Sequence, residues 1–402
     1  IIGNDNQFTP LWNVGLRWNL HREEFMKRWM WVDQFAVRGG FGYTGSIDKN
    51  ALPFVVMTLG QSVIYDGQTV PTSFSYPNPN VKWQTKQDMN VGLDLSLFDY
   101  RLELGVNYYN NITRDVLDRK ALPYSSGRSE VTENVADIYN SGWEIDLGVT
   151  LLKNKSFQWY AKANIAINDN KVKNTYYKDT KDLPKATLSN AHQFVENQPV
   201  NGWYGYKFAG INPINGAVMT YTGNGEATLD MSVSGATWPI PSVFYLGNLT
   251  PPVVGGFSTS ANWKQLIFSA NFEFKTGHKI KSFNTFRSLD ARNRHTSEAN
   301  RWREPGDITN VPAMSEAFTT YSSYMYDILL EKGNYLRCSY MTLGYNLKPE
   351  WLHKIGFSTA RLSFTAKDLF TVSSYSGIDP ALMGSFGYPN SRKYTITLNV
   401  GF

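Results

Sequence analysis

Hydrophobic and polar residues alternate one by one along many segments of the chain. Trp143, Ile145, Leu147, Val149 and Leu151 share one face of such a segment, and the residues between them are Glu, Asp, Gly and Thr. Because successive side chains of a strand point to opposite faces, the pattern predicts strands that are apolar on one side only. Further strands are predicted at Trp12–Leu20, Phe35–Tyr43, Val81–Leu97, Tyr100–Tyr108, Phe157–Ile167, Leu266–Phe274, Leu362–Ala366 and Tyr394–Phe402.

The length of these segments favours a membrane protein. Strands of a soluble sandwich have about 5–6 residues, whereas a tilted strand needs roughly 9–11 residues to cross a bilayer. Many of the alternating runs reach the longer value. Aromatic residues also lie near the ends of the runs, where rings prefer the headgroup level of a bilayer, although core packing at strand ends would place them there too. These residues are Trp12, Trp18, Trp83, Tyr108, Trp143, Trp159, Phe274 and Tyr394.

The connections between the predicted strands alternate between short and long. Tight turns are predicted at Phe98–Asp99, Lys153–Lys155 and Asn262–Lys264, and Lys348–Gly356 is short. Long connections are predicted at Gly45–Asn80, Thr113–Tyr139, Lys171–Gly255, Gly277–Lys332 and Thr371–Arg392, and His21–Met30 fits the alternation least well. Transmembrane barrels have short periplasmic turns and longer extracellular loops. The sequence therefore predicts an all-β transmembrane antiparallel β-barrel with about 11 strands in this chain, a periplasmic C-terminus and extracellular long loops.

Eleven strands with two bare edges cannot stand alone in lipid, since every backbone group there must be paired. The chain also begins at Ile1, without an initiator Met or a signal peptide. We therefore expect residues 1–402 to be the C-terminal part of a larger barrel whose N-terminal strands are absent from this sequence.

Composition narrows the function. The mean hydropathy is −0.36, and no apolar run approaches the roughly 20 residues of a spanning helix. The net charge of +5 comes without a basic reader motif, so nucleic acid is not an expected partner. A single cysteine excludes an internal disulfide. The five histidines lack metal-ligand spacing and no catalytic constellation occurs, so we expect neither an enzyme nor a cofactor. The histidines are His21, His192, His278, His295 and His353.

Several short motifs, in a fixed order along nearly the whole chain, resemble the barrel of SusC/RagA-type TonB-dependent transporters from Bacteroidota. They begin with Asn78-Pro79-Asn80, Trp83, Gly92-Leu93-Asp94, Tyr108-Tyr109-Asn110 and Tyr139-Asn140-Ser141-Gly142-Trp143-Glu144. They continue with Gly202-Trp203-Tyr204-Gly205-Tyr206, Gly247-Asn248, Arg301-Trp302, Pro305-Gly306, Tyr335-Leu336-Arg337 and Leu343-Gly344-Tyr345. They end with Asp368-Leu369-Phe370-Thr371, Ser376-Gly377-Ile378-Asp379-Pro380, Tyr388-Pro389 and Arg392.

The resemblance implies a bacterial outer-membrane importer of oligosaccharides or peptides with 22 strands, of which this chain would supply the second half. It implies a plug and a TonB box in the absent N-terminal half, a TonB partner and a SusD-like surface lipoprotein over the mouth. Two departures stand out. Gly223-Asn224-Gly225-Glu226 replaces an Asp-rich stretch of many relatives, which puts a cation site there in doubt. Cys338 replaces a basic residue and is expected to be a small buried or lumen-facing side chain.

Two groups of residues are candidate sites. The last strand carries an apolar row that ends at the carboxyl terminus and resembles the signal by which outer-membrane barrels reach their insertion machinery: Tyr394, Ile396, Leu398, Val400 and Phe402. The segment from Lys279 to Asp307 is rich in arginine and aromatic side chains, which are favoured at binding surfaces. The segment is expected to contact either the lipoprotein or the phosphates of lipopolysaccharide, and the alternative is a solvated basic loop. The residues expected to make the contact are Arg287, Arg292, Arg294, Arg301, Trp302 and Arg303.

Two other interpretations stay open. The barrel could be a structural or assembly component of a larger outer-membrane complex that has lost transport, for which the weakened Asp-rich stretch is an argument. A secreted β-sandwich lectin would have short strands and no regular alternation of loop lengths. The presence of a plug and a TonB box would distinguish a transporter from a structural component.

Overall fold

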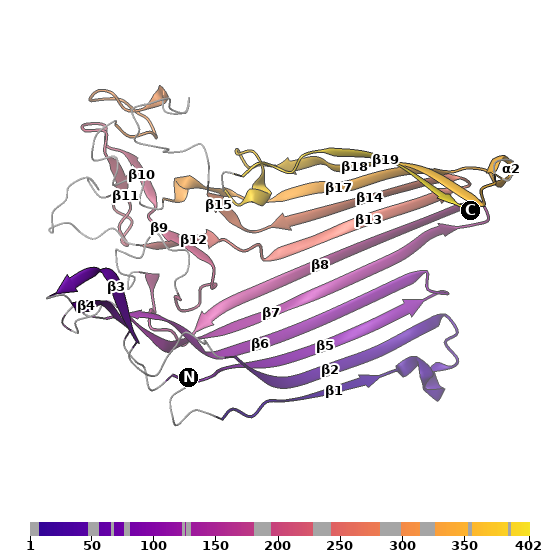
Figure 1. Cartoon of the computed structure of the whole chain (residues 1–402), viewed down its shortest axis with the longest axis horizontal. Helices are drawn as coiled ribbons and strands as arrows, with labels where there is room; N and C mark the ends of the chain where they lie inside the picture. The colour runs from indigo at the N-terminus through magenta and orange to yellow at the C-terminus, as the bar shows by residue number, and fades with distance from the viewer. Residues whose placement is uncertain are drawn as a thin grey trace.

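The computed structural model describes residues 8–46, 56–65, 68–75, 81–122, 125, 130–180, 194–227, 243–281, 299–313, 326–352, 356–384 and 387–402. Eleven strands form one antiparallel sheet in which each interior strand pairs with the strand on either side of it (Figure 1). In order they are β1 (Trp12–Trp18), β2 (Val32–Ser46), β5 (Gln84–Leu97), β6 (Leu102–Ala121), β7 (Glu130–Lys153), β8 (Phe157–Lys173), β13 (Val253–Trp263), β14 (Leu266–Thr276), β17 (Tyr335–Asn346), β18 (Thr359–Ser373) and β19 (Lys393–Gly401). The predicted number of strands is confirmed.

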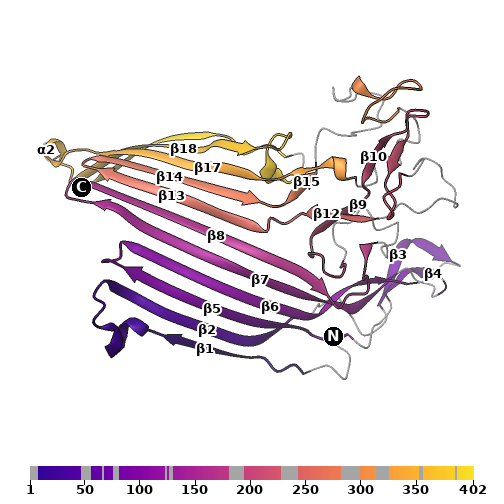
Figure 2. The ribbon, with the colours of Figure 1, turned by 180° about the vertical axis from the view of Figure 1, so that it is seen from behind.

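The sheet is open in the described part of the chain, because β1 pairs only with β2 and β19 pairs only with β18. Figure 2 shows the sheet from behind, with β1 at one edge and β17 and β18 toward the other. Both edges therefore carry backbone groups that no strand of the sheet pairs.

One end of the sheet has the short connections. Phe98, Asp99 and Tyr100 all take positive φ between 57° and 60°, which turns β5 directly into β6. Lys264, with a φ of 53°, does the same between β13 and β14. The connection between β1 and β2 is the irregular one, as predicted, and contains the 3₁₀ helices η2 (Leu20–Arg22) and η3 (Glu24–Met26). A short helix, α2 (Pro349–Leu352), lies between β17 and β18.

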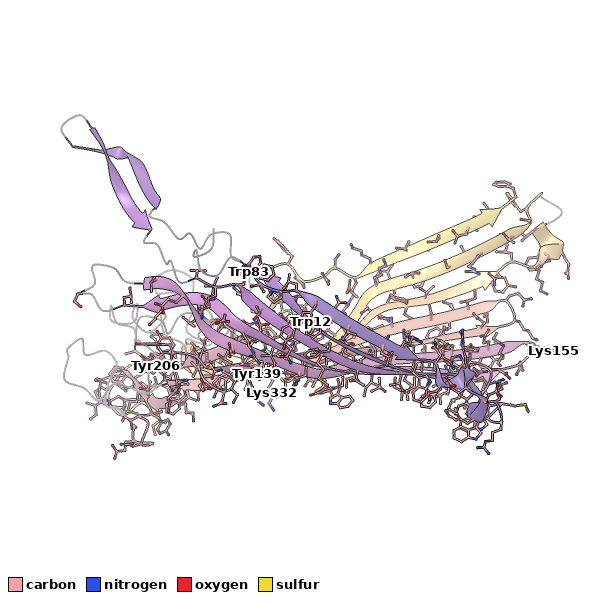
Figure 3. All side chains as sticks on the ribbon, turned by 90° about the horizontal axis from the view of Figure 1, so that it is seen from below. Trp12, Trp83, Tyr139, Lys155, Tyr206 and Lys332 are labelled. Carbon is pink, nitrogen blue, oxygen red and sulfur yellow. The ribbon has the colours of Figure 1, made fainter. Side chains whose placement is uncertain are left out.

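The other end of the sheet carries the long connections, which form small sheets of their own. The pairs are β3 (Val56–Tyr65) with β4 (Gln68–Ser75), β9 (Gly202–Gly205) with β12 (Phe244–Asn248), β10 (Phe208–Ile211) with β11 (Val218–Thr220), and β15 (Lys279–Lys281) with β16 (Leu330–Lys332). The 3₁₀ helices η8 (Asp327–Leu329) and η10 (Pro380–Leu382) also belong to this end. In Figure 3, Lys155 lies at the end of the sheet with the short turns, and Tyr206 and Lys332 lie among the long connections.

One predicted connection is wrong in extent. The expected loop over Thr113–Tyr139 is mostly strand, because β6 continues to Ala121 and β7 begins at Glu130. The two strands stay paired to their tips, with irregularities around Val116. Next to them Asp115 takes a positive φ of 56°, and its backbone N–H donates to the Asp137 carboxylate. The irregularity interrupts the clean period-two pattern, and this is why alternation alone ended the strands too early.

Candidate functional site: an apolar face, a polar face and an asparagine cleft

The register of the strands aligns their apolar residues into continuous rows. One row crosses nine strands, from β2 to β18, and all but two of its residues are large apolar side chains: Phe35, Leu95, Leu104, Leu147, Ala163, Phe257, Phe272, Cys338 and Phe370. Phe257 and Phe272 stack with their ring centroids 4.6 Å apart. The alternation of single strands thus becomes one apolar face of the whole sheet, here called the apolar face.

The apolar face is not covered by other parts of the described chain. Leu343 is 53% exposed and Phe257 is 41% exposed, although both lie within interior strands of the sheet. Exposed apolar surface of this extent marks contact with a partner or a membrane. A face that spans eleven strands and has apolar residues at alternate positions of each strand matches the lipid-facing surface of a barrel.

Aromatic side chains lie toward both ends of the apolar face. At the end near the long connections, Tyr108 packs on Trp143 with centroids 4.9 Å apart, and Trp12 contacts Tyr43 at 5.5 Å. At the other end Trp18, Trp159 and Trp263 are each between a third and two thirds exposed. Amphipathic rings in these positions are typical of the two aromatic girdles of a membrane barrel.

The neighbouring row lies on the opposite face and is polar except for Gly148. It is shifted by one residue as far as β14 and by more on β17 and β18, where the register is irregular. It crosses ten strands and consists of Gln34, Ser96, Glu103, Gly148, Lys162, Ser258, Asn271, Tyr340, Lys367 and Lys393. Charges on this polar face are paired across strands. Arg17 lies 3.0 Å from the Asp94 carboxylate, and Arg38 lies 3.6 Å from it and donates to the Asn107 side chain at 2.5 Å.

A cleft of about 610 Å³ lies at the end of the polar face next to the long connections. Its floor is the polar side of β5 to β8, and its roof comes from residues 197–201 and 245–252. Seven asparagines line it. Asn111, Asn140, Asn168 and Asn170 come from the strands, and Asn197, Asn201 and Asn248 come from the roof.

The long connections form a packed layer, here called the loop layer. The buried side chains at its centre are here called the loop core. Buried apolar side chains from two connections, the one between β8 and β13 and the one between β14 and β17, meet in it: Val195, Tyr204, Tyr206, Ile211, Val218, Val243, Tyr326 and Leu329. Burial raises the pKa of the Tyr204 hydroxyl well above its usual range, and raises that of Tyr245, which packs on this core, to about 12. Both tyrosines therefore stay neutral.

A buried ion pair joins the loop layer to the polar face. The Arg337 guanidinium on β17 donates to Asp379 Oδ1 at 2.6 Å and to the Thr371 hydroxyl at 3.1 Å. Asp379 also accepts from the backbone N–H of Ala381 and so caps η10. Both side chains are less than 10% exposed, so the pair fixes the segment that carries η10 against the sheet.

The structure places the last-strand residues as predicted from alternation. Tyr394, Ile396, Leu398 and Val400 lie on the apolar face of β19, in register with Ala366, Phe364, Leu362 and Ala360. Phe402 follows the strand and contacts Phe357 with centroids 5.0 Å apart. Their role in insertion stays a prediction.

The predicted arginine-rich segment is described only in part. Arg287, Arg292 and Arg294 lie outside the described residues. Trp302 is half-buried against the loop core and donates from Nε1 to the Pro213 carbonyl at 3.2 Å. Arg303 is exposed and donates to the Ala299 carbonyl at 2.9 Å, and Arg301 is partly exposed. Partner contact by these residues stays a prediction, and Trp302 has a packing role besides.

Three smaller expectations can be compared with the structure. Cys338 was expected to be either a small buried side chain or a lumen-facing one. It is fully buried and lies in the apolar row, not in the lumen. Residues 222–226 form a tight turn in which the Gly225 N–H donates to the Thr222 carbonyl. No group of three or more histidine, cysteine or carboxylate side chains that could hold a metal ion occurs among the described residues.

Sequence reasoning missed the asparagine cleft. The signal was present, because Asn111, Asn140, Asn168 and Asn170 all occupy polar-face positions of their strands. The roof asparagines follow no periodic pattern, and only the fold brings them to the strands. Separately, no helix in the described ranges is long and apolar enough to cross a membrane.

Comparison with known proteins gives consistent matches. The sequence model of the family described as "TonB dependent receptor-like, beta-barrel" matches residues 2–272. TonB-dependent receptor P3 of Formosa agariphila is 28% identical over 100% of this chain and 42% of its own length. TonB-dependent receptor SusC of Bacteroides thetaiotaomicron is 22% identical over 100% of this chain and 41% of its own length. A solved structure of the RagAB peptide transporter superposes with a TM-score of 0.77 at 25% identity, covering 100% of this chain and 44% of that one. The chain spans less than half the length of these relatives.

Proposed function

Because the chain belongs to the TonB-dependent receptor β-barrel family, we propose that it forms part of the wall of an outer-membrane importer of oligosaccharides or peptides. Members of this family are outer-membrane transport proteins and not enzymes. The observation that carries the proposal is the pair of neighbouring rows, one apolar across nine strands and one polar across ten. A wall with this division keeps lipid on one side and water on the other.

The proposal includes a larger barrel. In lipid, the bare edges of β1 and β19 would leave unpaired backbone groups, each of which costs several kcal/mol. We propose that residues 1–402 are the C-terminal part of the barrel and that both edges pair with further strands of the same protein, which also carries a plug and a TonB-contacting segment. The 41–44% of the relatives' length that the chain covers supports a barrel of about twice this width.

The orientation follows from the two ends of the sheet. Short turns are typical of the periplasmic side and long loops of the extracellular side. We therefore propose that Phe402 ends in the periplasm and that the loop core faces the outside. The row from Tyr394 to Phe402 is proposed as the insertion signal. Phe402→Ser is expected to lower the amount of heat-resistant barrel in the outer membrane several-fold, and unchanged assembly would contradict that role.

A SusD-like lipoprotein is the proposed partner of the extracellular layer. RagAB, with which the chain shares its fold and 25% identity, is named a peptide transporter, which supports transport for this barrel too. Exposed Arg303 and partly exposed Arg301 lie in the loop layer, where they can reach the carboxylates of a lipoprotein or the phosphates of lipopolysaccharide. Loss of the co-purifying lipoprotein in an Arg301→Ser/Arg303→Ser variant supports the first contact, and its full retention contradicts it.

The test of the proposed function is energised uptake. Cells that carry the full-length protein should accumulate labelled oligosaccharide or peptide, and removal of TonB should abolish accumulation. A structural component without transport is the second candidate, because the 222–226 turn has Glu226 as its only carboxylate where many relatives are expected to be Asp-rich. Assembly in the membrane without uptake of any cargo would favour that candidate. A soluble, detergent-independent monomer would contradict both.

A further inference from the structure

We propose that the asparagine cleft binds a neutral oligosaccharide on the barrel wall. This inference rests on the proposed importer function and names its cargo class and a binding site. The cleft, at about 610 Å³, has the size of a small-molecule site, and it opens on the polar face beneath the loop layer.

The floor of the cleft is a row of side-chain amides. Asn111, Asn140 and Asn170 are direct neighbours on β6, β7 and β8. Adjacent strands lie about 4.8 Å apart, so the three amides follow one another at that spacing. A carboxamide offers both donors and an acceptor, which matches hydroxyl groups that also do both.

Several amides of the cleft are held in one orientation by the protein. The Asn168 oxygen accepts from the Tyr109 hydroxyl at 2.8 Å, and the Asn248 oxygen accepts from the Tyr245 hydroxyl at 2.8 Å. The Lys173 ammonium donates to the Asn197 oxygen. With their oxygens bound in this way, the amide nitrogens remain as donors for a ligand. Fixed donors cost less to order when a ligand arrives, which favours binding.

A glycine makes one of these contacts possible. Tyr109 and Asn168 lie on β6 and β8, and Gly142 separates them on β7. A Cβ at position 142 would come within 2.4 Å of the Tyr109 hydroxyl. Glycine at this position therefore lets Tyr109 reach across a whole strand to orient the Asn168 amide.

The charges of the cleft favour a neutral ligand. Lys86 lies 2.5 Å from Asp88 and Lys171 lies 2.7 Å from Asp169. Both lysines that line the cleft are thus matched by a neighbouring carboxylate. Half-buried Tyr245 and the prolines of residues 251–252 add flat apolar surface, against which a sugar ring can stack its C–H face.

An extended peptide fits the floor less well. Its side chains on one face repeat every two residues, about 6.8 Å, which differs from the strand spacing of the amide row. Peptides also gain affinity by pairing with a bare sheet edge, but β6, β7 and β8 have neighbours on both sides. The ring hydroxyls of a sugar, spaced closely on every unit, suit the amide donors of Asn168, Asn197 and Asn248 better.

The test uses the full-length protein in detergent micelles on an array of neutral and acidic oligosaccharides and of uncharged peptides. The best-bound oligosaccharide is then titrated by calorimetry. Asn111→Ala is the decisive variant, because the Asn111 side chain lines the cleft and makes no side-chain hydrogen bond within the described structure. Loss of one or two hydrogen bonds should weaken binding about tenfold. The matched control is Asn271→Ala, an asparagine of the polar face outside the cleft, which should bind as the parent does.

Each outcome of this test either supports or overturns the assignment of the cleft. Binding of a neutral oligosaccharide that only Asn111→Ala weakens supports the inference. Binding of peptides in place of sugars, no binding of any neutral sugar, or equal effects of both substitutions overturns it. Energised uptake of peptide together with any of these results would overturn the cleft's assignment and leave the importer function standing. Absence of all uptake would instead contradict the importer function.

Discussion

The barrel wall and the loop layer bury their apolar residues in opposite ways. In the wall, apolar side chains such as Ile396 and Leu398 point away from the protein and are mostly exposed. In the loop layer, Tyr206, Val218 and Leu329 are almost fully buried against one another. The two regions are continuous in sequence, because the loop segments leave and re-enter the sheet between neighbouring strands.

This difference shows that one chain is built for two solvents. Apolar residues in the wall gain nothing from mutual burial that lipid would not also provide, and the sheet is held by its backbone hydrogen bonds. The loop layer is surrounded by water, so it needs a packed core like that of a soluble domain. Substitutions of one type should therefore have different effects in the two regions.

The largest effect is expected where the two regions meet. Arg337→Met removes the cation that pairs with buried Asp379, and an uncompensated buried carboxylate costs about 3–5 kcal/mol. The segment that carries η10 should detach from β17 while the sheet stays folded. Limited proteolysis and hydrogen exchange of residues 374–384 would measure this.

The control for this prediction is Arg361→Met. Arg361 also lies on the polar face and bonds Asn346 at 2.7 Å, but it is exposed, so the change should stay within about 0.5 kcal/mol. Equal protection of residues 374–384 in both variants would show that the ion pair does not hold the loop layer to the wall.

The next largest effect should separate the two faces of the wall. Phe257→Arg places a charge in the middle of β13 on the apolar face, at a cost of about 2–4 kcal/mol for a barrel in lipid. Ser258→Arg places the same charge one residue further, on the polar face, and should cost little. Urea-dependent folding of the full-length protein into phospholipid vesicles would compare them, and equal stabilities would contradict the assignment of the faces.

Most of the wall could be predicted from the sequence, because its signal is local. Period-two alternation from Trp143 to Val149 places each residue on a face without knowledge of its neighbours. The predicted tight turns and most of the predicted long connections also lie at opposite ends of the sheet, except that most of Thr113–Tyr139 is strand. The ends of β6 and β7 near their connection were not predicted as strand, because the irregularity near Asp115 and Val116 shifts the period by a residue.

The loop layer and the cleft could not be predicted in this way. The loop core joins Val195, Tyr206 and Val218, which follow β8, to Leu329, which lies much further along the chain before β16, and the four follow no common period. The cleft needs both a strand row and a roof that only tertiary contacts bring together, as between Val200 and Asn170. Tyr204 and Tyr206 lie in a motif of the sequence, but only the fold shows that both are buried in the loop core.

A smaller effect is expected when a single methylene is removed from each of the two regions. Ile211→Val in the loop core should cost about 0.5–1.5 kcal/mol, because it leaves a small cavity among buried side chains. Ile396→Val on the apolar face should cost nearly nothing, since lipid fills the space. Hydrogen exchange of the loop layer and vesicle folding of the wall would report each change, and a larger cost at Ile396 would reverse the comparison.

The smallest effect is a pH dependence confined to the loop layer. His278 is buried between β14 and β15, both ring nitrogens lack hydrogen-bond partners in the described structure, and the ring packs on Gly333. Burial lowers the pKa of His278 below its ordinary value of 6.5, and nearby Lys275 lowers it further. The folded state therefore holds the neutral ring while the unfolded state takes up a proton, so stability is lost as the pH falls below about 6.5.

Hydrogen exchange of β15 and β16 should accelerate between pH 7.5 and pH 5, beyond the intrinsic pH dependence of exchange. The His278→Gln variant should lose this extra acceleration, because its side chain stays neutral at both pH values. If the variant retained the full pH response, the ring would not be its source, and the sensitivity of the loop layer would have to come from its carboxylates.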